Sequence, residues 1–299
     1  MKNATVVINP IAGPGRARTI DSCAALAKDA LARGGFESDV RITTGPADAQ
    51  RFATEALAAG HQLVVAWGGD GTVNGVGAAL TGTRVPLAII PGGSGNGLAR
   101  DLGLPLDAPA AFDVAASGAT RAIDAGELDG SLFFNVAGIG LDARIAVRLA
   151  EPGARRGLLG YIVATVRELS TYRASEYAIA VLDGRTPASF STTALFIAMA
   201  NSRQYGNGAQ IAPHARLDDG QLDVVVVKPQ SVLSIASRIP AFFRGTLQAD
   251  DKVLMRTAAA VDISSDHAIS FHVDGEPRNG STTVELRTRP LALLVRVKP

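Results

Sequence analysis

The chain of 299 residues contains one cysteine, Cys23, so it cannot form an internal disulfide. This composition suits a reducing compartment. No uncharged apolar run approaches the roughly 20 residues of a membrane-spanning helix. The first residues, MKNATVVINP, also lack the apolar core of a signal peptide. We therefore expect a cytoplasmic protein that makes at most transient contact with a membrane surface.

The chain also has no large excess of charge of either sign, because 29 Lys and Arg residues are balanced by 28 Asp and Glu residues. The net charge of +1 gives no overall attraction for nucleic acid, which we exclude as a partner. The composition, 47% hydrophobic and 19% charged, is that of a folded chain. Its length suffices for two ordinary domains.

Several common catalytic motifs are absent. The sequence has no GxxxxGK[ST], no GxGxxG after a strand and no protein-kinase set, which excludes the P-loop, dinucleotide and protein-kinase fingerprints. It also lacks GxSxG and HExxH. The histidines, each of which we interpret as structural or solvated, are His61, His214, His267 and His272.

The first part of the chain alternates apolar runs with stretches of helical periodicity. Strands are expected at 4–8, 39–42, 63–67 and 86–90, and helices at 20–31, 46–59, 72–80 and 98–102. This order predicts an α/β domain over residues 1–121, with a parallel sheet covered on both faces.

The pattern changes near residue 122, where strand-like runs and Asp-Gly turns at 129 and 183 begin to dominate. We predict an antiparallel β-rich domain over 122–290, with helices near 157–172 and 232–243. The last run, 291–297, could pair within this domain or return to the first one.

Residues 63–75, LVVAWGGDGTVNG, hold the strongest functional signal. A buried strand ends in Gly68-Gly69, Asp70 follows, and Thr72 precedes a helix. Free backbone N–H groups at such a corner attract phosphate. The Asp70 carboxylate would be repelled by bare phosphate, so its presence argues for a bridging Mg²⁺. A second glycine loop, PGGSGNG at 91–97, also follows a strand, where ligands bind in open α/β sheets.

Two further acidic clusters are weaker signals. They are Asp218-Asp219-Gly220 and Asp274-Gly275-Glu276. Each on its own is more typical of a turn than of a catalytic site.

These motifs together resemble the diacylglycerol kinase catalytic superfamily, which includes bacterial lipid kinases and sphingosine kinases and is distantly similar to NAD kinases and phosphofructokinases. The match extends over nearly the whole chain. The segments that carry it, besides GGDGTVN, are Asn9-Pro10 with Gly13 and Gly15, Thr43 with Asp48-Ala49, PGGSGNGLAR at 91–100, Ile123-Asp124, Phe134-Asn135, GIGLD at 138–142 and DGE at 274–276.

The resemblance implies a nucleotide-binding domain of NAD kinase-like fold, followed by a β-sandwich that binds lipid, with the lipid entering between the domains. It implies that ATP binds at Asn9, Thr43, Gly68, Gly69, Asp70, Gly71, Thr72, Val73, Asn74 and Ser94. Asp70 would act on the triphosphate through Mg²⁺, and Asp124 would support this metal site without contacting the ion. Asp219 and the carbonyls of Arg216 and Gln221 would hold a structural Mg²⁺. Asp274 or Glu276 would be the base that deprotonates the lipid hydroxyl.

Two positions depart from the family pattern. Gly75 replaces the usual Glu, and Gly97 replaces the usual Asp, which makes the second loop similar to that of sphingosine kinases. We expect an ATP- and Mg²⁺-dependent lipid kinase of phospholipid metabolism, acting on a diacylglycerol-like alcohol. A sphingoid-base kinase, an NAD kinase and an inactive nucleotide-binding module remain alternatives, and a homodimer stays open. The segment Arg155-Arg156, followed by Leu158, Leu159, Tyr161 and Ile162, is a candidate membrane-facing patch, although a helix packed on its own domain is the commoner explanation.

Overall fold

The computed structural model describes residues 2–12, 19–151, 153–154, 157–182 and 188–299. The chain divides into two compact units. Unit 1 comprises Met1–Ile123 and Leu291–Pro299, and unit 2 comprises Asp124–Pro290. Gly13, Gly15, Arg155-Arg156 and the Asp-Gly pair at 183–184 lie outside the described residues.

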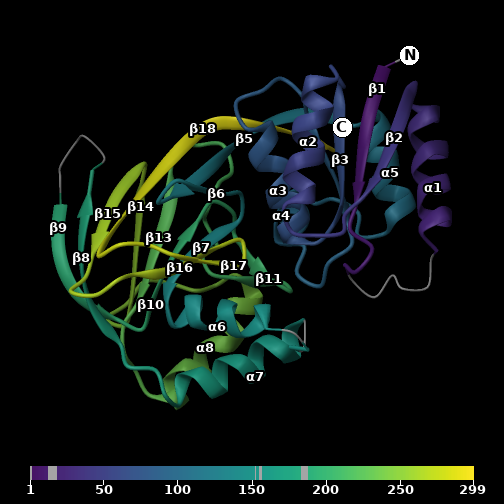
Figure 1. Cartoon of the computed structure of the whole chain (residues 1–299). Helices are drawn as coiled ribbons and strands as arrows, with labels where there is room; N and C mark the ends of the chain where they lie inside the picture. The colour runs from purple at the N-terminus through teal and green to yellow at the C-terminus, as the bar shows by residue number, and fades with distance from the viewer. Residues whose placement is uncertain (1, 13–18, 152, 155–156, 183–187) are drawn as a thin grey trace. The chain divides into compact units, whose positions relative to one another are not determined.

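Unit 1 is an α/β domain built on parallel strands in the order β2-β1-β3-β4. The helices α1 and α5 pack together on one face of this sheet, and α2 and α3 pack together on the other (Figure 1). The elements are β1 (Lys2–Ile8), α1 (Ile20–Arg33), β2 (Phe36–Ile42), α2 (Asp48–Ala58), β3 (Leu63–Gly68), α3 (Asp70–Leu80), β4 (Leu87–Pro91), α4 (Gly97–Asp101) and α5 (Ala108–Ser117).

Three helices of unit 1 differ from the sequence-based expectation. The helix α2 begins at Asp48, after Pro46, and α3 begins at Asp70, before Thr72. The helix α5 was not predicted at all. Its start signal was nevertheless present, because the Asp107 side chain accepts a hydrogen bond from the backbone N–H of Ala110.

Unit 2 is a β-sandwich. One layer contains β15, β8, β9, the hairpin of β5 and β6, and the first part of β18; the other has the order β14-β13-β10-β7-β16-β17. Buried side chains from both layers, such as Ile263 and Phe271, form a common core. The strands are β5 (Ala119–Leu128), β6 (Ser131–Phe133), β7 (Val136–Gly140), β8 (Ser175–Val181), β9 (Ala188–Ala194), β10 (Phe196–Ala200), β13 (Leu222–Val227), β14 (Val253–Ala258), β15 (Ala260–Ser264), β16 (Ser270–Val273), β17 (Glu276–Asn279) and β18 (Thr283–Val297), with the separate pair β11 (Gln204–Gly206) and β12 (Ala209–Gln210).

The last strand of the chain, β18, pairs with strands of both units. Near its start Val284 pairs with Ile263 of β15 in antiparallel register. Near its end Val295 pairs with Leu87 of β4 in parallel register. A single continuous strand of 15 residues therefore belongs to both units.

Unit 2 also contains the helices α6 (Leu141–Ala150), α7 (Leu158–Leu169) and α8 (Val232–Arg244). The helix α6 was not predicted, because its apolar residues directly continue the apolar run of β7. None of the helices in the described part of the chain is long and apolar enough to cross a membrane.

Candidate functional site

The residues of the predicted nucleotide corner lie at the carboxyl ends of the parallel strands of unit 1. All four parallel strands end there, and the residues at or just after their ends are Asn9, Thr43, Gly68 and Pro91. The backbone N–H of Thr43 donates to the carbonyl of Ile8 at 2.9 Å, which joins the first two ends. In open α/β sheets, ligands bind outside the carboxyl ends of the strands.

The two glycine loops lie directly against each other at these strand ends. The backbone N–H of Gly92 donates to the carbonyl of Gly68 at 2.8 Å. A Cβ atom on Gly93 would lie 2.6 Å from the Cα of Gly69, closer than van der Waals contact allows. Glycine at these positions is thus required for the approach of one loop to the other.

Asp70 connects the two loops. Its carboxylate accepts hydrogen bonds from the backbone N–H groups of Asn96, at 3.0 Å, and Gly97, at 2.8 Å. Removal from water raises the pKa of the Asp70 carboxyl, and these two donors partly offset the rise. A Cβ atom on Gly95 would lie 2.7 Å from Oδ2 of Asp70, so this carboxylate is closely enclosed by backbone.

Asn96 fixes the shape of the second loop. It adopts a left-handed conformation with φ of 51°. Its side chain accepts from the N–H of Gly93 at 2.9 Å and donates to the carbonyl of the same residue at 2.8 Å. Ser94 is exposed within this closed loop, where its hydroxyl can reach a ligand.

The start of α3 provides the rest of the corner. The Asn9 side-chain amide donates to the hydroxyl of Thr72 at 3.2 Å. Thr72 and Val73 are buried in the first turn, whereas Gly71 is exposed. The N–H groups at the start of a helix lack partners within it and attract phosphate. One carboxylate beside such a phosphate site is a donor set that suits Mg²⁺, which takes its remaining ligands from phosphate and water.

The structure gives a packing reason for one of the two departures from the family pattern. Gly75 lies where α3 crosses α2, and a Cβ atom there would approach the Cβ of Ala49 to 3.0 Å. Gly97 is buried and contributes the shorter hydrogen bond to Asp70, but this bond comes from the backbone and does not require glycine.

The acidic segment 274–276 forms the turn of the β16–β17 hairpin. Asp274 and Gly275 both have positive φ, 48° and 86°, as expected for a two-residue turn of this kind. The Asp274 carboxylate accepts from the backbone N–H groups of Phe134, Asn135 and Val136 at 2.9 to 3.1 Å. Asp274 thus anchors the turn, and Glu276 lies exposed beside it.

The second predicted metal segment lies around Asp219. The backbone N–H of Gly220 donates to the fully buried Asp124 at 2.7 Å, and that of Gln221 donates to Asp219 at 3.1 Å. Burial, together with the nearby Asp219, raises the pKa of Asp223 to about 6. No cluster of three His, Cys, Asp or Glu side chains suited to a metal occurs among the described residues. A site with one carboxylate and the carbonyls of Arg216 and Gln221 stays a prediction.

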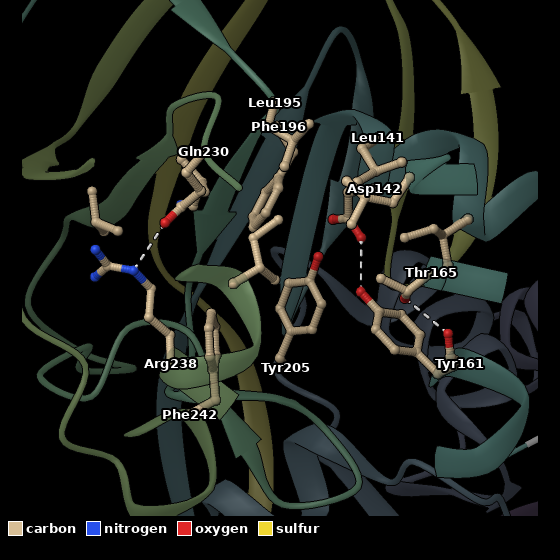
Figure 2. Close-up of a pocket in the computed structure, with 15 residues that line it drawn as sticks. Leu141, Asp142, Tyr161, Thr165, Leu195, Phe196, Tyr205, Gln230, Arg238 and Phe242 are labelled. Atoms are coloured by element: carbon tan, nitrogen blue, oxygen red, sulfur yellow. Dashed lines mark hydrogen bonds between the residues drawn. The ribbon is translucent and has the colours of Figure 1, made fainter. Parts of the chain in front are cut away.

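Unit 2 contains an apolar pocket that the sequence did not predict (Figure 2). Its walls come from α6, α7, α8 and the neighbouring strands. The lining is mostly aliphatic and aromatic and includes Leu141, Ile145, Leu169, Leu195, Phe196 and Phe242. Pockets of this character bind apolar ligands.

A buried polar group lies at the wall of this pocket. Asp142 accepts from the Tyr161 hydroxyl at 3.3 Å and lies 2.6 Å from Nε2 of His272. The Gly275 N–H donates to Nδ1 of His272 at 3.3 Å, which places the proton of a neutral ring on Nε2. Burial and the charge of Asp142 raise the pKa of the Tyr161 and Tyr205 hydroxyls well above the ordinary value.

A signal for this group was available in the sequence, within the GIGLD segment at 138–142. Gly138 is required because a Cβ atom there would overlap both Asp142 and His272. The pairing was not predictable, because 130 residues separate Asp142 from His272.

Two family models match the chain. The diacylglycerol kinase catalytic domain matches residues 3–128. The YegS C-terminal NAD kinase beta sandwich-like domain matches residues 135–297, more than half of the chain. The chain belongs to the diacylglycerol kinase catalytic-domain family.

Relatives in this kinase family extend over almost the whole chain. A "Probable lipid kinase YegS-like" of Pseudomonas syringae pv. tomato is 33% identical over 275 residues, which cover 90% of this chain and 87% of the relative. The corresponding protein of Salmonella arizonae, "Probable lipid kinase YegS", is 32% identical and covers 89% of this chain and 88% of its own length.

Solved structures share the fold of this family member. A diacylglycerol kinase from Bacillus anthracis has a TM-score of 0.75 at 23% identity, covering 100% of this chain and 97% of that one. Another structure from the same organism has a TM-score of 0.81 at 24% identity, with the same coverage. The predicted fold class, an α/β domain with a β-sandwich, is confirmed.

Proposed function

We propose that the protein transfers the γ-phosphoryl group of ATP to the hydroxyl of a lipid. The observation that carries this proposal is the position of Asp70. It lies at the start of α3, directly after the first glycine loop, and its carboxylate accepts hydrogen bonds from backbone N–H groups of the second glycine loop. Phosphoryl transfer requires mainly positioned phosphates and charge stabilisation, which this corner can provide.

Bound Mg²⁺-ATP would supply the phosphoryl group and the charge that neutralises it. Asp70 would orient the ion, while the first N–H groups of α3 and the exposed Ser94 would position the phosphates. Asn9, Thr43 and Asn74 would complete the nucleotide site. The hydrogen bond from Asn9 to Thr72 holds the first strand end against α3, which keeps these groups aligned.

We assign the general base to Glu276. The Asp274 carboxylate is occupied by three backbone N–H groups and orients the turn. Glu276 lies exposed at the start of β17, where a carboxylate can accept the proton of an alcohol. Asp274 would then be a positioning residue.

The substrate that fits best is an uncharged lipid alcohol of the diacylglycerol type. The apolar pocket of unit 2 would take part of an acyl chain. The match of residues 3–128 to the diacylglycerol kinase catalytic domain favours this alcohol over a sphingoid base.

The test is to incubate the protein with labelled ATP, Mg²⁺ and separate samples of diacylglycerol, sphingoid base, NAD and total lipid extract. We expect label in diacylglycerol or in another neutral lipid. Asp70→Asn should abolish labelling, while Gly45→Ala, at a position with open space around it, should not. Label in NAD alone would replace this proposal with a dinucleotide kinase, and label in no sample would favour an inactive nucleotide-binding module.

A further inference from the structure

The helix α8 directs its apolar side chains towards solvent. Val232 is 64% exposed, Leu233 83%, Ile239 49% and Phe243 40%. None of the helix residues is buried. With Ala236 and Pro240, these side chains cover one side of α8, which lies in the lower part of unit 2 in Figure 1.

The inward side of α8 is mixed, because Ile235 and Phe242 line the apolar pocket there beside the polar residues Ser234 and Arg238. The Ser234 hydroxyl donates to Oε1 of Gln230 at 2.7 Å, and Nε of Arg238 donates to the same oxygen at 3.1 Å. Arg238 also pairs with Asp250 at 2.7 Å. A helix on the surface of a water-soluble domain normally presents charged and polar residues to solvent, whereas the outward side of α8 presents four large apolar side chains.

The helix α7 repeats this arrangement on the other side of the apolar pocket. Ile162 is 46% exposed, Val163 53% and Val166 64%. The acidic residue of this helix, Glu168, is buried and pairs with Arg144 and Arg148 of α6. We call the exposed set Ile162, Val163, Val166, Val232, Leu233, Ile239 and Phe243 the α7–α8 apolar face.

The exposed charges on the two helices themselves have one sign, although the exposed Asp250 pairs with Arg238 of α8. Arg167 and Arg244 are exposed next to it. Among the described residues of α7 and α8, no carboxylate is exposed. A surface of this composition is complementary to anionic lipid headgroups above an acyl layer.

The apolar face is also continuous with the pocket. Ile235 and Phe242 of α8 line the pocket, while Leu233 and Phe243 of the same helix face outward. Tyr161 and Leu169 of α7 line it from the other side. The two helices thus carry apolar side chains on the side of the pocket and on the side of solvent.

We propose that α7 and α8 insert the α7–α8 apolar face into the surface of an anionic lipid bilayer. This inference rests on the proposed lipid kinase function, because that function supplies the reason for an acyl chain to enter the pocket. It places the contact on the outer side of α8 and on Ile162, Val163 and Val166 of α7. It shares Ile162 with the candidate patch of the sequence analysis, whose pair Arg155-Arg156 lies outside the described residues.

The test is co-sedimentation of the full chain with phosphatidylcholine vesicles that contain or lack phosphatidylglycerol. We expect stronger binding to the anionic vesicles. The double variant Leu233→Ser, Phe243→Ser should reduce partitioning about a hundredfold, because each large apolar side chain contributes about tenfold. Arg244→Gln should reduce binding to the anionic vesicles about fivefold and leave binding to pure phosphatidylcholine unchanged.

The matched control is Ile20→Ser, which removes an equally exposed aliphatic side chain from α1 in unit 1. It should bind vesicles as the parent does. Unchanged thermal unfolding of all variants shows that the fold is retained. Turnover on a short-chain lipid dispersed as monomers should be the same in parent and double variant, since neither side chain lines the pocket.

Parent-like vesicle binding by the double variant overturns the proposal. So does a dimer in sedimentation velocity that the same substitutions dissociate, because a second copy would then cover the face. Vesicle binding through this face without phosphorylation of any lipid would instead overturn the proposed function and leave the bilayer contact standing.

Discussion

Gly93 and Gly69 approach so closely that a Cβ atom on the former would lie 2.6 Å from the Cα of the latter. Two loops that follow different strands thereby share one surface, and Asp70 is hydrogen-bonded across it. The geometry of the corner formed by these two loops thus depends on the absence of side chains at this contact.

Gly93→Ala should separate the two loops and weaken ATP binding at least about tenfold. Overpacking of this kind costs about 1 to 3 kcal/mol. Calorimetric titration with Mg²⁺-ATP measures the effect. Gly45→Ala, in open space, is the control and should bind as the parent does. Equal affinities for both variants would mean that the loops can shift without loss.

Asp274→Asn and Glu276→Gln should separate anchoring from catalysis. Asp274→Asn should lower the free energy of unfolding by about 2 kcal/mol or more, because a carboxylate that accepts three N–H groups is lost. Glu276→Gln should leave stability within about 0.5 kcal/mol but reduce kcat at least about a hundredfold. Urea unfolding and steady-state kinetics measure the two effects. If Glu276→Gln retains kcat within a few-fold, Glu276 is not the base.

The His272–Asp142 pair should make stability depend on pH. Burial lowers the pKa of the His272 imidazole, but Asp142 and Asp274 outweigh this effect and raise it above the ordinary value of 6.5. The folded state therefore binds the proton more tightly than the unfolded state. The stabilisation is complete below pH 6.5 and is lost as the pH rises through the raised pKa.

His272→Gln should accordingly lower the free energy of unfolding by about 3 kcal/mol below pH 6.5 and by less at alkaline pH. Urea unfolding across a pH series measures the difference. His267→Gln is the control, because His267 forms an exposed pair with Asp266 and should cost at most about 1 kcal/mol. A cost for His272→Gln that does not change with pH would contradict the assignment.

Asp219→Asn should remove thermal stabilisation by Mg²⁺ if the 216–221 segment holds a structural ion. A ligand at about a hundred times its dissociation constant adds roughly 2.7 kcal/mol to stability. Scanning calorimetry with Mg²⁺ or with chelator measures the shift. Asp218→Asn, at the neighbouring carboxylate, should keep it. Retention of the full shift by Asp219→Asn would locate the ion elsewhere.

The meeting of the strand ends and glycine loops could be foreseen from the sequence because its parts are local. Gly68, Gly69 and Asp70 follow one strand directly, and parallel strands bring their carboxyl ends to one edge. The metal and base assignments came from the family resemblance, because Asp219 and Asp274 look like ordinary turn residues. Asp274 is indeed in a turn, but its three donors lie about 140 residues away in the chain, beyond any local pattern.

The pocket escaped prediction for a different reason. Its walls come from three helices and several strands, and α6 was hidden within the continuous apolar run after β7. The pattern of α8 suggested a helix near its observed bounds, yet periodicity alone could not tell which side faces solvent. Only the structure shows that Leu233 and Phe243 face outward, while hydrogen bonds to Gln230 hold Ser234 and Arg238 on the other side.

The shared strand β18 has a consequence for the order of events during synthesis. The carbonyl of Ala292 accepts from the N–H of Gly82, and Arg296 donates to the carbonyl of Gly118, so the segment after Pro290 completes unit 1. The ribosome makes this segment only after all of unit 2. Unit 1 therefore stays one strand short until unit 2 has been translated, so the last step of its folding follows the synthesis of unit 2.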